Sequence, residues 1–169
     1  MARTDFSSPR LFVEASLAEG GRIALSPEQA NYLLNVLRLR ESARVLVFNG
    51  REGEFIASIE GATRKSAALA IGARLRAQEF APDLDYLFAP LKHARLDYMA
   101  QKAVEMGARR LRPVMTRRTQ ASRINLDRLR ANAQEAAEQC GIIWLPEILA
   151  EETLDKALAR YLTCALKNM

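Results

Sequence analysis

The residues best suited to bind an anionic partner are a cluster of arginines from Arg109 to Arg123. Six arginines fall within these fifteen residues. A guanidinium group grips phosphate with two parallel hydrogen bonds, so such a cluster suits a phosphate-rich ligand. As an RNA-contacting surface it would steer RNA toward the protein, and its affinity would fall as salt rises. The alternative is a solvated charged loop. The candidate RNA contacts in this region are Arg112, Arg117, Arg118 and Arg123.

Three other cations are candidates because of their positions. Arg38 and Arg40 come just after a predicted helix, where they either contact an RNA backbone or complement the helix dipole. Lys92 lies between a predicted strand and a helix. There it meets a substrate phosphate or a cofactor carboxylate, or it is only a solvated loop residue. His93 is the only histidine and has no cysteine or histidine partner at ligand spacing, so the sequence predicts no metal site.

The composition sets limits on the class of protein. The net charge is +5 and 49% of the residues are hydrophobic, which indicates a globular chain. Most of the basic residues are arginine, either for phosphate binding or because a GC-rich genome encodes arginine. No apolar run approaches the ~20 residues of a membrane span, so no membrane partner is expected. Two cysteines make no disulfide framework, which favours the cytoplasm.

The elements that must position the first cations are short strands and one helix. Phe12-Val13 and residues 22–25 read as strands around a Gly20-Gly21 turn. Ser26, Pro27 and Gln29 predict a helix start with a capping box. Three further strands, at 44–48, 54–59 and 67–71, are joined by glycine turns. One short helix among antiparallel strands indicates a small β-barrel.

The second half alternates strand and helix. An apolar run at 84–89 precedes a helical pattern ending at Gly107, and residues 110–115 precede a helix over 125–140. This order predicts a parallel α/β unit, whose ligands bind at the carboxyl ends of its strands. The arginine cluster lies after one of those strands.

Several segments in this half also resemble a known protein family in sequence. Gln101-Lys102-Ala103-Val104-Glu105-Met106-Gly107, Arg112-Pro113-Val114 and Glu135-Ala136-Ala137-Glu138-Gln139-Cys140-Gly141 resemble runs of the RsmE family. These bacterial enzymes methylate N3 of a uridine in small-subunit (16S) ribosomal RNA. In the first half, the segment from Tyr32 to Arg38 resembles the same family. Asn31-Tyr32 stands where the family usually has histidine, and Ile142 where an arginine commonly follows.

The resemblance implies a fold and a cofactor. It implies an N-terminal PUA-like RNA-binding β-barrel over residues 1–73, a linker over 74–82 and a partial SPOUT α/β methyltransferase domain over 83–169. The family binds S-adenosylmethionine (SAM) in a C-terminal knot with a Gly-Pro-Glu-Gly-Gly loop, and that loop does not occur in this sequence. We therefore expect a truncated chain that lacks the knot, binds SAM poorly and is inactive alone. The implied partner is 16S ribosomal RNA or the small subunit, and the full-length protein is expected to be a homodimer.

Two alternatives remain open at this point. The chain is either the first part of an RNA methyltransferase or an RNA-binding module without catalysis. A nucleotide-binding α/β protein is disfavoured, because no glycine-rich phosphate loop follows a strand. Methyl transfer needs a base that helps the uridine lose its N3 proton, and the sequence assigns that role to no residue.

Overall fold

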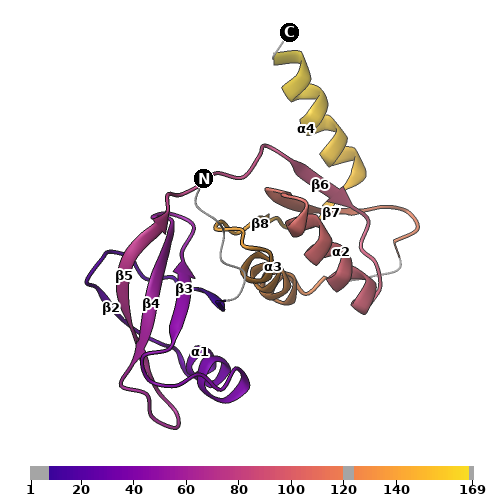
Figure 1. The fold of residues 1–169 in the computed structure, drawn as a ribbon. Helices are drawn as coiled ribbons and strands as arrows, with labels where there is room; N and C mark the ends of the chain where they lie inside the picture. The colour runs from indigo at the N-terminus through magenta and orange to yellow at the C-terminus, as the bar shows by residue number, and fades with distance from the viewer. Residues whose placement is uncertain (1–7, 120–123, 168–169) are drawn as a thin grey trace. The chain divides into compact units, whose positions relative to one another are not determined.

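The computed structural model describes residues 8–119 and 124–167. The chain divides into two compact units (Figure 1). The first comprises Met1–Phe80 and Glu138–Trp144, and the second comprises Ala81–Ala137 and Leu145–Met169. The boundary predicted at residues 74–82 stays a prediction.

The first unit is built on a curled five-stranded sheet. Its strands lie in the order β1-β3-β4-β5-β2, with β1 parallel to β3 and the other pairs antiparallel. Alternate side chains of β3 and β4, among them Val45, Val47 and Ile59, fill its apolar core. The strands are β1 (Arg10–Phe12), β2 (Arg22–Ala24), β3 (Arg44–Phe48), β4 (Glu54–Glu60) and β5 (Ala68–Arg76).

One helical segment packs Ala30, Leu33 and Leu34 into this core. It starts as α1 (Pro27–Asn31), with the predicted capping box in place: Ser26 Oγ accepts from the N–H of Gln29 at 3.2 Å. It continues as a single π-helical turn, η1 (Tyr32–Val36), rather than as the regular helix expected. The turn is π-helical because its hydrogen bond joins residues five apart: the N–H of Leu37 donates to the carbonyl of Tyr32.

A buried ion pair stabilises the sheet near the start of β4. Arg10 Nε lies 2.8 Å from Glu54 Oε1, and both side chains are about 2% exposed. Arg76, at the end of β5, lies 3.7 Å from the other carboxylate oxygen. Because Arg76 pairs in register with Glu54, β5 extends beyond residue 71, where the sequence pattern suggested that the strand ends.

Residues 138–144 belong to the first unit although they lie far along the chain. The N–H of Phe12 donates to Glu138 Oε1 at 3.0 Å. Arg76 donates to the carbonyl of Gly141 at 2.9 Å, and the side-chain amide of Gln78 donates to the carbonyl of Ile143 at 3.2 Å. These bonds tie both ends of the strand region to the same short segment. Nothing in the local sequence pattern predicted it.

The second unit is a parallel α/β arrangement, as predicted. β6 (Asp85–Phe88) pairs with β7 (Arg110–Met115), and β7 pairs on its other side with β8 (Glu147–Ile148). The end of β7 also pairs with β9 (Glu152–Thr153), and all these pairs are parallel. The helices are α2 (His93–Glu105), α3 (Leu126–Cys140) and α4 (Leu154–Lys167). The sequence analysis did not predict α4.

The two faces of this sheet carry different side chains. Strand alternation puts Asp85, Arg110 and Arg112 on one face and Tyr86, Phe88 and Leu111 on the other. Successive right-handed crossovers in one direction place α2 and α3 on the same face. Asp97 of α2 accordingly accepts hydrogen bonds from Arg128 and Asn132 of α3. The charged face carries α4.

None of the helices in the described part of the chain is long and apolar enough to cross a membrane. Among those same residues, no three His, Cys, Asp or Glu side chains gather where a metal ion would bind.

Candidate nucleic-acid interface

Arg117 and Arg118 lie at the tip of a tight turn directly after β7. The N–H of Thr116 donates to Thr119 Oγ1 at 2.8 Å, and the N–H of Thr119 donates back to the carbonyl of Thr116 at 3.1 Å. These bonds fix the turn and leave both arginine side chains exposed. No ion pair joins either guanidinium to another described residue within 4 Å, so both remain available to an external anion.

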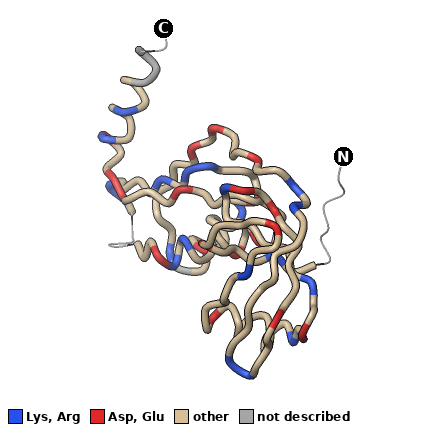
Figure 2. Tube along the Cα trace, turned by 90° about the vertical axis from the view of Figure 1, so that its left-hand side faces the viewer, with Lys and Arg blue, Asp and Glu red and all other residues tan. Residues whose placement is uncertain are grey.

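Lys92 is exposed at the same edge of the sheet. It is the N-cap residue of α2 and follows the carboxyl end of β6, the parallel neighbour of β7. The loops that follow the carboxyl ends of parallel strands lie at the same edge of the sheet, so Lys92 and the Arg117–Arg118 turn share that edge. Figure 2 shows how Lys and Arg, in blue, intermingle with Asp and Glu along the chain.

Arg112 differs from these three cations because it is buried. Only 6% of the residue is exposed, and its guanidinium lies 3.2 Å from Asp85 and 3.3 Å from Glu152. Its Nε is buried and has no hydrogen-bond partner among the described residues. The geometry therefore favours a structural role for Arg112, and its predicted contact with RNA stays a prediction.

Asp85 is the centre of a partly buried network that includes Arg112. It accepts hydrogen bonds from Arg110, Arg112 and the hydroxyl of Tyr161 on α4. Burial raises the pKa of Asp85, but the bonds from Tyr161, Arg110 and Arg112 outweigh burial and hold the pKa below its usual value. Burial and the same hydrogen bond raise the pKa of Tyr161. The network joins α4 to the charged face of the sheet.

Arg38 and Arg40 lie in the first unit, just after η1. Both side chains are exposed, and Arg38 has a φ of 56°, in the left-handed region that non-glycine residues seldom adopt. These two arginines are therefore described with the first unit. Arg123 falls outside the described residues.

The structure thus brings Lys92, Arg117 and Arg118 to one sheet edge of the second unit, while Arg38 and Arg40 belong to the first unit. Sequence reasoning missed three further exposed cations near Arg40: Arg44, Arg64 and Lys65. Their positions at the ends of predicted strands could have identified them, because Arg64 and Lys65 lie between two predicted strands and Arg44 is the first residue of a third.

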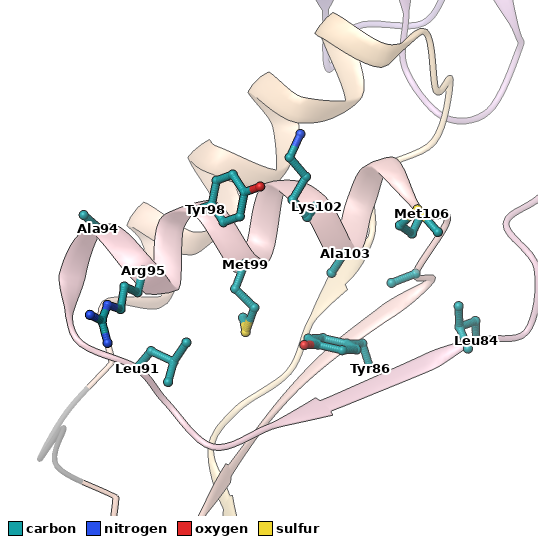
Figure 3. Close-up of a pocket in the computed structure, with 11 residues that line it drawn as sticks. Leu84, Tyr86, Leu91, Ala94, Arg95, Tyr98, Met99, Lys102, Ala103 and Met106 are labelled. Atoms are coloured by element: carbon teal, nitrogen blue, oxygen red, sulfur yellow. The ribbon is translucent and has the colours of Figure 1, made fainter.

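A cavity of about 610 Å³ lies between α2 and β6 (Figure 3). Tyr86, Met99 and Leu91 point toward it, while Arg95 and Lys102 are the charged residues in its lining. Lys102 already pairs with Glu105 at 2.6 Å and lies 5.6 Å from the ring centre of Tyr98. Among the described residues that line this cavity there is no carboxylate to bind ribose hydroxyls or a sulfonium, so their side chains do not fit SAM.

A second cavity, of about 750 Å³, borders the start of α3. Asp127 and Arg130 in its lining pair with each other at 2.7 Å, and Glu151 adds a further carboxylate. Two acids and one neutralised arginine provide no cation to hold the carboxylate of a methionyl tail. This cavity does not fit SAM either.

Comparison with known proteins identifies both parts of the chain. Residues 78–168 match the family model described as an RNA methyltransferase domain, which covers more than half of the chain. Residues 25–72 match the model described as an RNA methyltransferase PUA domain. These matches confirm the predicted combination of a PUA-like barrel with a SPOUT-type methyltransferase part.

Individual proteins agree with these models. The chain is 29% identical over 131 residues to the ribosomal RNA small subunit methyltransferase E of Rickettsia conorii. It is similar to a Legionella pneumophila methyltransferase solved with bound SAM (26% identity, TM-score 0.83, 90% of this chain and 66% of that one). It is also similar to the SAM-bound methyltransferase E of Neisseria gonorrhoeae (25% identity, TM-score 0.80, 89% of this chain and 64% of that one).

The chain spans about half the length of the curated relatives it matches. The match covers 77% of this chain and 54% of the Rickettsia protein, and 83% of this chain and 58% of a relative from Buchnera aphidicola at 26% identity. The match of residues 78–168 covers the larger part of the chain, and it assigns the family: this chain belongs to the RNA methyltransferase domain family.

Proposed function

We propose that this chain is the RNA-binding barrel and part of the catalytic domain of an enzyme that methylates N3 of a uridine in 16S ribosomal RNA. The observation that carries the proposal is the match of residues 78–168 to the RNA methyltransferase domain. The relative from Rickettsia, a small-subunit ribosomal RNA methyltransferase, supports the substrate class.

The exposed cations are consistent with this substrate. Lys92, Arg117 and Arg118 present three positive charges at the carboxyl edge of a parallel sheet, where such folds bind ligands. Contacts of this kind position a nucleic acid through its phosphates and do not read its sequence. The uridine itself must be unstacked to expose N3, so a loop or splayed nucleotide is the expected target.

The methyl donor of the reaction is SAM, which two structural neighbours bind. In the proposed enzyme SAM supplies an already activated methyl group. The side chains of the two cavities described above do not fit it, and the Gly-Pro-Glu-Gly-Gly loop of the family does not occur in these 169 residues. We therefore propose that these 169 residues alone bind SAM weakly and transfer no methyl group.

A second candidate function is an RNA-binding module without catalysis. The poor fit of both cavities to SAM favours it for the chain taken alone. The reading frame in the genome separates the two candidates. A frame that continues into a glycine-rich segment favours the enzyme, which we then expect to act in the cytoplasm as a homodimer. A frame that stops at Met169 favours the binding module.

The experiment that tests RNA recognition is a competition between ribosomal RNAs. Labelled 16S RNA is bound to the purified chain and displaced with unlabelled 16S RNA or with large-subunit RNA at equal nucleotide concentration. We expect 16S RNA to compete more strongly. Equal competition would limit the proposal to general RNA binding, and failure of the chain to bind either RNA would overturn it.

A further inference from the structure

Five exposed cations gather at one end of the barrel in the first unit. Two of them, Arg64 and Lys65, lie in the hairpin between β4 and β5. Glu41 holds this hairpin beside Arg40, because its carboxylate accepts hydrogen bonds from the N–H groups of Gly61 at 3.0 Å and Ala62 at 2.8 Å. The barrel-end patch consists of Arg38, Arg40, Arg44, Arg64 and Lys65.

Arg44 extends the patch across the sheet. It pairs in register with Ser58 of β4, which pairs with Ala70 of β5, which pairs with Arg22 of β2. Three strand spacings, about 14 Å, therefore separate Arg44 from Arg22, which lies outside the patch and pairs with Glu60.

The acidic residues at this end do not neutralise the patch. Glu41 is occupied by two backbone N–H groups, and Glu60 pairs with Arg22 at 3.5 Å. Within the described part of the chain, no carboxylate lies within 4 Å of a cation of the patch. All five charges face solvent and are available to an anion.

The backbone that carries the patch is fixed in an unusual conformation. Arg38 and Ser42 are the two described non-glycine residues with positive φ, at 56° and 64°. The N–H of Ser42 bonds to the carbonyl of Ile59 at 2.8 Å, and the N–H of Ile59 bonds to the carbonyl of Ala43 at 3.0 Å. Strained backbone that neighbouring bonds hold in place is typical of binding sites.

We propose that the barrel-end patch binds the phosphate backbone of the RNA substrate. This inference rests on the proposed function and adds the surface through which the barrel holds RNA. Four of the five cations are arginines, which suit phosphate by their planar fork. All five lie within residues 25–72, the part that matches the PUA domain of RNA methyltransferases, and this favours RNA over an anionic membrane or an acidic protein.

The test compares variants that each lose two positive charges. Arg64→Gln/Lys65→Gln and Arg40→Gln/Arg44→Gln remove charge from the patch. Arg74→Gln/Arg95→Gln removes two exposed charges elsewhere and serves as the matched control. Binding of a 16S RNA fragment is measured from 50 to 300 mM KCl, and circular dichroism with thermal unfolding establishes that each variant is folded.

Each phosphate contact contributes about 0.7–0.9 to the slope of log K against log salt. The two patch variants should therefore lose about 1.4–1.8 units of slope, and the control should keep the parental slope. If the parent binds RNA but the patch variants match the control, the patch proposal is wrong while the proposed function stands. If the parent does not bind RNA, the proposed function itself fails.

Binding to phosphatidylserine vesicles tests whether the ligand of the patch is RNA or a lipid surface. We expect the parent to bind RNA at salt concentrations at which it leaves the vesicles. A patch variant that loses vesicle binding but retains RNA binding would overturn the assignment.

Discussion

The hydroxyl of Tyr161 donates a hydrogen bond to the carboxylate of Asp85, which lies 76 positions earlier in the chain. The same carboxylate accepts from Arg110 and Arg112 of β7. One acidic side chain at the start of β6 thus joins two strands and a helix. Arg110 and Arg112 of β7 are bound in this network, while Arg117 and Arg118, which follow the end of β7, are exposed.

Asp85→Asn should destabilise the second unit by about 3 kcal/mol, because it leaves the buried Arg112 without one of its two carboxylates. In the parent, folding lowers the pKa of the Asp85 carboxyl group. The stability that this carboxylate contributes is therefore present above its unfolded pKa of about 3.9 and is lost as pH falls through its folded pKa. Urea unfolding between pH 2.5 and 7 measures both effects. The variant should show a flatter acid dependence than the parent.

The exposed Glu19→Gln serves as the control for this measurement and should change the unfolding free energy by less than about 0.5 kcal/mol. Identical acid dependence of Asp85→Asn and the parent would mean that the network does not form.

The buried pair of Arg10 and Glu54 gives a second prediction. Glu54→Gln leaves the guanidinium of Arg10 buried without its charged partner, and should cost about 3–5 kcal/mol of unfolding free energy. The double variant Arg10→Met/Glu54→Leu removes both charges of the pair, and Arg76 keeps its ion pair with Glu79 at 3.1 Å, so this variant should recover part of that loss. A double variant as unstable as Glu54→Gln would contradict this account of the pair.

Gly53 is a position where the backbone needs glycine. Its φ is +100°, and an added Cβ would lie 2.2 Å from the carbonyl oxygen of Arg76. Gly53→Ala should lower the unfolding free energy by at least about 2 kcal/mol. Gly20→Ala is the matched control, since Gly20 has a φ of +80° but no atom within 4 Å of a Cβ, and it should cost only about 1 kcal/mol. Equal losses would show that the close approach has no effect on stability.

The affinity of the chain for SAM can be measured directly. Calorimetry should detect no binding, or binding weaker than about 1 mM, for the 169-residue chain. One site per chain with micromolar affinity, about −8 kcal/mol, would mean that the described residues do form a donor site.

Local sequence signals predicted much of the fold because they depend on near neighbours. The capping box of Ser26 and Gln29 and the glycine after α2 were both identified in this way. The burial of Arg112 was not foreseen, since the carboxylates that hold it lie 27 and 40 positions away. The hairpin with Arg64 and Lys65 likewise lies beside Arg40 because Glu41 accepts hydrogen bonds from Gly61 and Ala62, a tertiary contact that no periodicity reveals.

Salt-dependent binding of a 16S RNA fragment tests the central claim most directly, with the parent, Arg117→Gln/Arg118→Gln and the control Arg74→Gln/Arg95→Gln measured side by side. The account predicts that the parent binds with a steep salt dependence, and that loss of the two turn arginines weakens binding and flattens the slope by about 1.4–1.8 units. A parent that does not bind RNA would contradict the account, and unchanged affinity and slope in the Arg117/Arg118 variant would contradict the assignment of that turn to RNA.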